Sequence, residues 1–325
     1  DCLLTVSPEE TILIPAFYAK EKTMHTSNRL SRLSSLWDRL PGGKLRKWAR
    51  ISLLGLLVIS VMFGVSFIEA RRGDYGGMPG ISERTLARLS VPAAMTITVN
   101  DAGEAVANDG KCTLREAITA TNTNTISGGA TGECAAGMAG TDNIVFALGA
   151  GTPTINLTSA LPTITEPITI KGNSGGATSV ELNGAGAGAG ANGLRITAGN
   201  STIQRLVINR FNGSGILITG TGFNTIKGCL IGTNANGSTG QANGVGIEIR
   251  GSSDNSIGGT MPGDRNVISA NTGAGVLIAY DTGNSLAATG NKVIGNFIGT
   301  DFNGKLDLGN GGFGVDIVGG DNSTV

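Results

Sequence analysis

The sequence has 325 residues, with 53 glycines, only 14 aromatic residues (2 Trp, 3 Tyr and 9 Phe) and 15% charged residues. This composition excludes a helical bundle and a highly charged disordered chain, and the hydrophobic content of 40% is enough for a packed core. Residues 1–95 carry 13 basic and 8 acidic side chains, whereas residues 96–325 carry 11 basic and 16 acidic ones. The second part is therefore acidic by 16 − 11 = 5 charges, which argues against a nucleic-acid partner.

The first strong feature along the chain is an uncharged, mostly apolar run at residues 51–68. Its 18 residues are long for the core of a signal peptide and just long enough to cross a bilayer. Basic residues before the run place the N-terminus in the cytoplasm and the rest outside (Lys44, Arg46, Lys47 and Arg50). We expect residues 44–70 to be a cleaved export signal or a retained anchor; a buried core helix is the third interpretation.

Composition divides the rest of the chain into segments. Residues 1–43 form a polar extension, and whether the mature protein keeps it stays open. Residues 71–94 are a Gly- and Arg-containing linker, residues 95–141 an N-terminal cap, and residues 142–325 a repeat region that we expect to be truncated at its C-terminal end.

The cap begins with an alternating strand pattern at residues 95–100. Thr113 and Glu116 then have the spacing of a capping box, in which each side chain bonds the backbone N–H of the other. Apolar residues on one face predict a short amphipathic helix that ends near Asn122. An open solenoid exposes an apolar end, so we expect this helix to cover the first coil.

Cys112 and Cys134 lie 22 residues apart on either side of this helix. In an oxidising exported setting they predict a disulfide that stabilises the fold by about 3 kcal/mol. A metal site is the weaker interpretation, because no Cys-x-x-Cys motif exists and the single histidine, His25, precedes the apolar run. Cys229 is expected to pack as a small apolar residue.

Short strands are expected after the cap, and a glycine-alanine run at residues 184–193 predicts a flexible turn rather than a nucleotide-binding loop. Residues 224–234 then return as residues 291–301, an offset of 67 residues. Residues 244–249 recur as residues 312–317, at an offset of 68. Such a constant spacing indicates a repeat architecture.

A shorter pattern, glycine followed by alternating aliphatic residues, occurs five times, at Gly193, Gly215, Gly246, Gly275 and Gly314. The period of two predicts half-buried strands. Asparagines that precede these strands, such as Asn243, Asn271 and Asn310, are expected to turn the chain through positive φ. Strands and tight turns without helical periodicity bury their apolar faces only when coils stack, so the pattern predicts a parallel β-solenoid.

The repeats GVLIAY, NVISAN, NKVIGNFIGTD and NSIGGT resemble the coils of right-handed parallel β-helix proteins from bacterial surfaces and secretions. The segment Cys112-Thr-Leu-Arg-Glu-Ala-Ile resembles the CSLREA-type segment that precedes such repeats, with Thr113 in place of the serine. The resemblance implies an exported β-helix whose first coil follows this cap.

Candidate chemistry lies on the outward positions of the five strands: Arg195, Leu217, Glu248, Leu277 and Asp316. Stacked coils would place Glu248 and Asp316 about 10 Å apart, near the separation used by inverting glycosidases. A solvated face gives two such acids by chance, so catalysis is the weaker interpretation. Arg250 and Arg265 are candidates for a lyase base, although isolated arginines are more often surface positions.

Asp301 is the single metal candidate, in a turn that matches the turn at Asn234. One acid per loop favours a hydrogen-bonded turn over Ca²⁺, and we expect no cofactor. Asparagines that precede other strands are expected to stack their amides along a turn (Asn224, Asn255, Asn291 and Asn322).

The sequence therefore predicts an all-β, right-handed parallel β-helix with a short capping helix, preceded by a transmembrane or signal helix. The function expected is non-catalytic: an extracytoplasmic surface, secreted or anchored, for adhesion to polysaccharide or to a surface protein. The alternative is a polysaccharide lyase or glycoside hydrolase of the same fold class.

Overall fold

The computed structural model describes residues 2–7, 10–14 and 94–325. The chain divides into two units, Asp1–Leu89 and Ser90–Val325. In the first unit, β1 (Cys2–Ser7) pairs with β2 (Glu10–Ile14) as an antiparallel hairpin that the sequence patterns did not predict.

The expected export segment, residues 44–70, lies outside the described residues, and so does the linker up to residue 93. None of the helices that the structure does describe combines the length and apolar character that a bilayer crossing requires. Export by residues 51–68 therefore stays a prediction.

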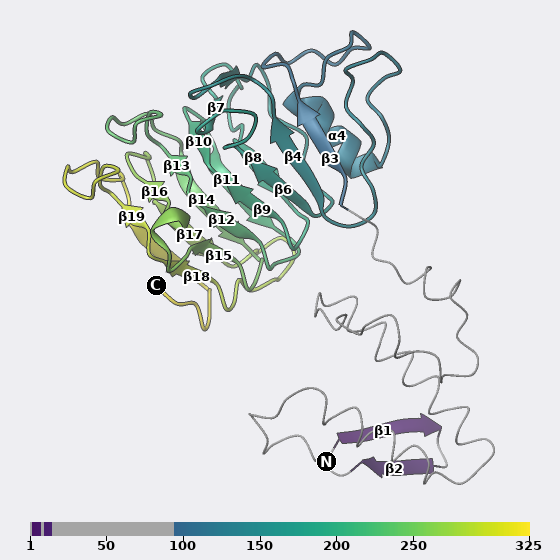
Figure 1. Ribbon diagram of the computed structural model, residues 1–325. Helices are drawn as coiled ribbons and strands as arrows, with labels where there is room; N and C mark the ends of the chain where they lie inside the picture. The colour runs from purple at the N-terminus through teal and green to yellow at the C-terminus, as the bar shows by residue number, and fades with distance from the viewer. Residues whose placement is uncertain (1, 8–9, 15–93) are drawn as a thin grey trace. The chain divides into compact units, whose positions relative to one another are not determined.

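Three parallel sheets make up the second unit (Figure 1). The first sheet has seven strands: β3 (Thr96–Val99), β4 (Asp142–Phe146), β6 (Ile168–Lys171), β9 (Thr202–Gln204), β12 (Thr225–Lys227), β15 (Ser256–Gly258) and β18 (Lys292–Ile294). The second sheet has six: β5 (Thr154–Asn156), β7 (Val180–Asn183), β10 (Leu206–Asn209), β13 (Leu230–Ile231), β16 (Val267–Ile268) and β19 (Phe297–Ile298). The third has five: β8 (Leu194–Ile196), β11 (Ser214–Thr219), β14 (Val245–Arg250), β17 (Val276–Ala279) and β20 (Val315–Val318).

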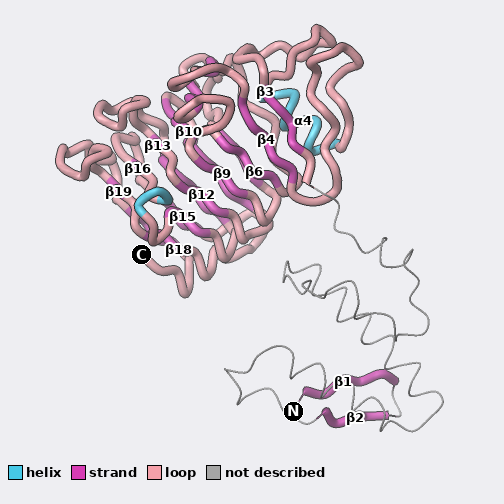
Figure 2. The backbone as a smooth tube through the Cα atoms, in the orientation of Figure 1, coloured by secondary structure: helices cyan, strands magenta, loops and turns pink. Residues whose placement is uncertain are grey.

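From β6 onward the chain visits the first, second and third sheets in unbroken rotation. Each strand pairs in parallel with the strand that the chain reaches one rotation later, as β11 does with β14. Figure 2 shows the strands side by side, with loops at the ends of the strands. This is the all-β parallel architecture that the sequence predicts, and its right-handed sense stays a prediction.

Aliphatic side chains stack in register inside the coils. In the first sheet each inward residue lies beside its equivalent in the next strand, and none is more than 4% exposed (Ile97, Ile144, Ile170, Ile203, Ile226, Ile257 and Val293). In the third sheet Ile247 and Val276 are fully buried, and Val315 packs against the core from the last coil. Burial of one such side chain contributes about 2 kcal/mol, so the columns drive folding.

Asparagine amides form ladders at the corners between sheets. The Nδ2 of Asn224 donates to Oδ1 of Asn255 at 3.0 Å, and the Nδ2 of Asn255 donates to Oδ1 of Asn291 at 2.9 Å. A second ladder joins Asn243, Asn271 and Asn310. These side chains are buried or half-buried, so the ladders satisfy amides that water does not reach.

Two expectations about asparagine were wrong. Within residues 94–325, Asn243, Asn271 and Asn310 do not adopt positive φ; they shape the corners through their side chains. Asn322 does not join the first ladder, because Lys292 pairs with Thr324 and the residue beside Asn291 is therefore Ser323. Asn322 itself has a positive φ of 55°.

The glycine-alanine run at residues 184–193 also differs from expectation. Ala187 and Ala191 are buried members of the hydrophobic core, so the run is packed rather than merely flexible. A Cβ at Gly184 would lie 2.4 Å from the Phe211 ring, which explains the need for glycine there. Cys229 is a buried free thiol, as expected, and burial raises its pKa to about 11.

The helix α4 (Leu114–Thr123) lies beside β3 at the start of the stack (Figure 1). Thr113 and Glu116 form the predicted capping box, with Thr113 N–H donating to Glu116 Oε2 at 3.0 Å. The helix ends at Thr123, one residue later than the expected Asn122, and its C-cap Asn124 adopts the left-handed conformation. Its buried face includes Leu114, Ala117 and Ile118, which join the core.

The expected disulfide between Cys112 and Cys134 is present, and both residues are buried. It ties the start of α4 to the loop that follows the helix. The first coil is therefore covered by a helix with both a polar cap and a covalent closure.

The 67-residue repeat corresponds to two coils. Asn234 and Asp301 begin matching turns after β13 and β19, whereas β16, which lies between those strands, has no such turn. Phe302 N–H donates to the carbonyl of Gly237 at 2.9 Å, so the two turns meet across the intermediate coil.

Candidate functional site

The five outward positions of the third sheet lie in one row, as the sequence predicts. Leu217 pairs with Arg195 and with Glu248, and Leu277 stands between Glu248 and Asp316. Two strand spacings separate the two acids, which is about 10 Å. The row therefore has the expected order, while a catalytic role for it remains a hypothesis.

Glu248 is held by its neighbours. It is only 9% exposed, and Ser214 Oγ donates to its Oε2 at 2.6 Å. The other carboxylate oxygen pairs with the guanidinium of Arg250. Both oxygens are occupied, so Arg250 serves as an ion-pair partner here, and the site offers neither a free acid at Glu248 nor a free base at Arg250.

Asp301 closes a turn. Its Oδ1 accepts hydrogen bonds from the backbone N–H groups of Lys305 at 2.7 Å and Leu306 at 3.0 Å. The Lys305 N–H, followed by that of Leu306, lowers the pKa of the Asp301 carboxyl below its ordinary value of 3.8. Within the described residues, no three or more His, Cys, Asp or Glu side chains gather where they could hold a metal ion.

Arg265, the other base candidate, lies over the ring of Phe297 with its guanidinium carbon 4.2 Å from the ring centre. Its Nε donates to the carbonyl of Gly295 at 3.1 Å. These two contacts give the side chain a packing role at the edge of the second sheet.

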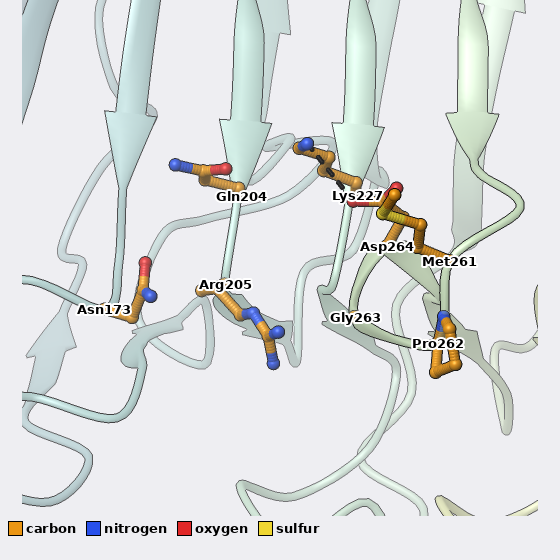
Figure 3. Close-up of a pocket in the computed structure, with 8 residues that line it drawn as sticks. All are labelled: Asn173, Gln204, Arg205, Lys227, Met261, Pro262, Gly263 and Asp264. Carbon is orange, nitrogen blue, oxygen red and sulfur yellow. Dashed lines mark ion pairs between the residues drawn. The ribbon is translucent and has the colours of Figure 1, made fainter.

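A cleft of about 480 Å³ opens where strands of the first sheet end (Figure 3). Asn173, Gln204 and Lys227 follow or end successive strands, and the short helix η1 (Pro262–Asp264) forms the opposite wall. The lining residues are Asn173, Gln204, Arg205, Lys227, Met261, Pro262, Gly263 and Asp264. Because three coils and an insertion contribute, the cleft exists only in the stacked structure.

The cleft is lined by two basic residues, Arg205 and Lys227, and by one acidic residue, Asp264. Lys227 Nζ lies 3.1 Å from Asp264 Oδ1, which uses the single acidic residue of the lining. Within the part of the chain that the structure describes, the exposed Arg205 guanidinium makes no hydrogen bond or ion pair. The lining therefore carries one uncompensated positive charge.

A row of polar side chains runs along the outer face of the same sheet. Its members are in register and are exposed or half-buried: Thr96, Asn143, Thr169, Thr202, Thr225, Ser256 and Lys292. Within residues 94–325, the hydroxyls of Thr169, Thr202 and Thr225 donate to no protein acceptor. A second outward row, Lys171, Gln204 and Lys227, runs beside it into the cleft.

Sequence reasoning missed Arg205 and this polar row. A signal for Arg205 was present: Lys227-Gly228 and Ile294-Gly295 occupy equivalent corners, and Gln204-Arg205 replaces the glycine with arginine. The row could not be recognised, because the spacing between its members varies from coil to coil.

Comparison with known protein families and with curated proteins finds no family model and no protein that matches this sequence.

Proposed function

We propose that this protein is an exported, right-handed parallel β-helix of the CSLREA-associated type that presents an elongated surface to extracellular polysaccharide or to a surface protein, without catalysis. The polar row of the first sheet carries this proposal. Its side chains recur at the strand spacing of about 4.8 Å on an open face. A ligand with repeating hydroxyl groups matches such a row better than a compact ligand does.

The hydroxyls of Thr169, Thr202 and Thr225 support glycan contact because each is free to donate and accept hydrogen bonds. A protein surface that served only for solubility would carry scattered charges instead. Location outside the cytoplasm is supported by the buried disulfide between Cys112 and Cys134, since such bonds persist in oxidising compartments.

The test removes three hydroxyls and keeps the shape of the strand residues. The variant Thr169→Val/Thr202→Val/Thr225→Val should lose retention on immobilised polysaccharides by about tenfold or more, because each lost hydrogen bond contributes about 1 kcal/mol. The control Thr158→Val/Thr239→Val/Thr282→Val removes exposed hydroxyls outside this sheet and should bind as the original chain does. Equal loss in both variants contradicts the role of the polar row. Retention of no glycan by the original chain contradicts polysaccharide binding and leaves a surface protein as the partner.

A carbohydrate-active enzyme is the second candidate, favoured by the placement of Glu248 and Asp316 in one row two strands apart. Against it, Leu277 separates the two acids and Glu248 already binds Ser214 and Arg250. We expect no reducing-end or unsaturated product from a panel of polysaccharides. Product release that is lost in Glu248→Ala would establish the enzyme and overturn the non-catalytic proposal.

A further inference from the structure

The corner residue Arg205 has an unusual backbone for its side chain. It forms the one-residue link between β9 and β10, with a φ of 58°. Gly228 fills the equivalent corner one coil later with a φ of 62°. A side chain in the left-handed region carries a cost that the equivalent glycine avoids, so the contacts of the Arg205 guanidinium are the feature of this corner to explain.

Neighbouring glycines leave room for this side chain. A Cβ at Gly228 would lie 3.0 Å from Arg205 Nε, and a Cβ at Gly263 would lie 3.3 Å from Arg205 Nη2. The guanidinium therefore lies along the corner, between the next coil and the turn that carries η1. Figure 3 shows it in the cleft, with Asn173 on one side and the η1 wall on the other.

Around this cation the cleft offers groups suited to hydroxyls. The amides of Asn173 and Gln204 both donate and accept hydrogen bonds, and Lys227 is neutralised by Asp264. Arg205 keeps its charge uncompensated, and its planar fork matches the two oxygens of a carboxylate. The cleft volume of about 480 Å³ lies within the range of small-ligand sites.

We propose that the Arg205 cleft binds the carboxylate of an acidic sugar in a uronate-containing polysaccharide, whose neighbouring hydroxyls lie along the polar row of the first sheet. This inference rests on the proposed glycan-binding function and adds the class of sugar. An acidic peptide would also pair with Arg205, but it would leave the regular hydroxyl row without partners.

The test measures binding of the full chain to a uronate polymer, alginate, by calorimetry. Arg205→Gly removes the cation and also relieves the left-handed backbone, so the variant should keep its melting temperature and lose affinity by about tenfold or more. Arg205→Lys keeps the charge but lacks the planar fork of the guanidinium. Its affinity for alginate should lie between those of the original chain and of Arg205→Gly. Arg195→Gln removes another exposed arginine, on the third sheet, and should bind alginate normally.

Binding of other polymers distinguishes the uronate inference from the proposed glycan-binding function on which it rests. An alginate ester without charge, dextran sulfate and poly-glutamate should all bind at least tenfold more weakly than alginate. Equal binding of dextran sulfate or poly-glutamate would overturn the carboxylate-sugar assignment. Binding of neutral glycans alone would overturn it and leave the proposed function standing, whereas binding of no glycan would overturn both this inference and the polysaccharide part of the proposed function.

Discussion

The first coil and the last described coil of the stacked sheets are built differently. At the first coil, α4 buries Ile118 completely, and the disulfide between Cys112 and Cys134 closes the segment around it. At the last coil, Ile317 and Val318 of β20 are 40% and 57% exposed, and in the described residues β20 has a partner strand, β17, on one side.

This difference between the first coil and the last described coil shows which part of the stability comes from the repeated coils themselves. Inward aliphatic columns stabilise the interior coils, because each coil is paired on both sides, and asparagine ladders add hydrogen bonds in the coils from Asn224 onward. The columns cannot bury their own terminal members. A helix with a different sequence pattern, and a covalent bond, complete the core at the first end.

The largest effect is expected at the covered end. Ile118→Ala should lower the free energy of unfolding by about 4 kcal/mol, because it opens a cavity between the helix and the first coil. Ile317→Ala in the last described coil should cost this chain less than about 1 kcal/mol, since that side chain is already 40% exposed. Denaturant titration of both variants measures the contrast, and equal losses would refute the difference between the ends.

Loss of the disulfide should have the next largest effect. The double variant Cys112→Ser/Cys134→Ser should lose about 3 kcal/mol, because the 22-residue loop regains entropy when unfolded. Hydrogen exchange should accelerate in α4 and leave β20 unchanged. Faster exchange in the last coil as well would show that the closure supports the whole stack rather than the first coil.

An interior ladder residue should matter more than its counterpart in the last coil. Asn255→Ala leaves the buried N–H and amide of Asn224 without their acceptor and should cost about 2 kcal/mol. Asn322→Gly should be neutral within about 0.5 kcal/mol, because that side chain is exposed and outside the ladder, and glycine tolerates the positive φ at this position. A matching loss at Asn322 would contradict the register at Lys292 and Thr324.

The smallest effect is a pH response confined to one turn. The lowered pKa of Asp301 means that its contribution to stability is fully present above the ordinary value of 3.8 and is lost as pH falls through the lowered value. The amide signal of Leu306 should therefore move in an acid NMR titration. The matching amide of Thr239, which donates to neutral Asn234, should stay constant, and a shared response would rule out Asp301 as the cause.

Alternation was enough to predict the five strands of the third sheet and their inward faces, because alternate side chains of a strand point to opposite faces of its sheet. Local chemistry predicted the capping box at Thr113 and the disulfide at Cys112. The Arg205 cleft was beyond such reasoning, because its walls come from Asn173, Gln204 and η1, which are distant in sequence. The sequence wrongly predicted that Asn322 joins the asparagine ladder, because a one-residue shift in strand register does not change the repeated sequence.

The contact between the turns at Asn234 and Asp301 limits where coils could be inserted into this protein. They touch across a coil that lacks such a turn, through Phe302 and Gly237. If one more coil were inserted between them, the two turns would lie about 4.8 Å further apart, which is one strand spacing, and the contact would be lost. Duplication of a whole pair of coils, one with the turn and one without it, would preserve the contact.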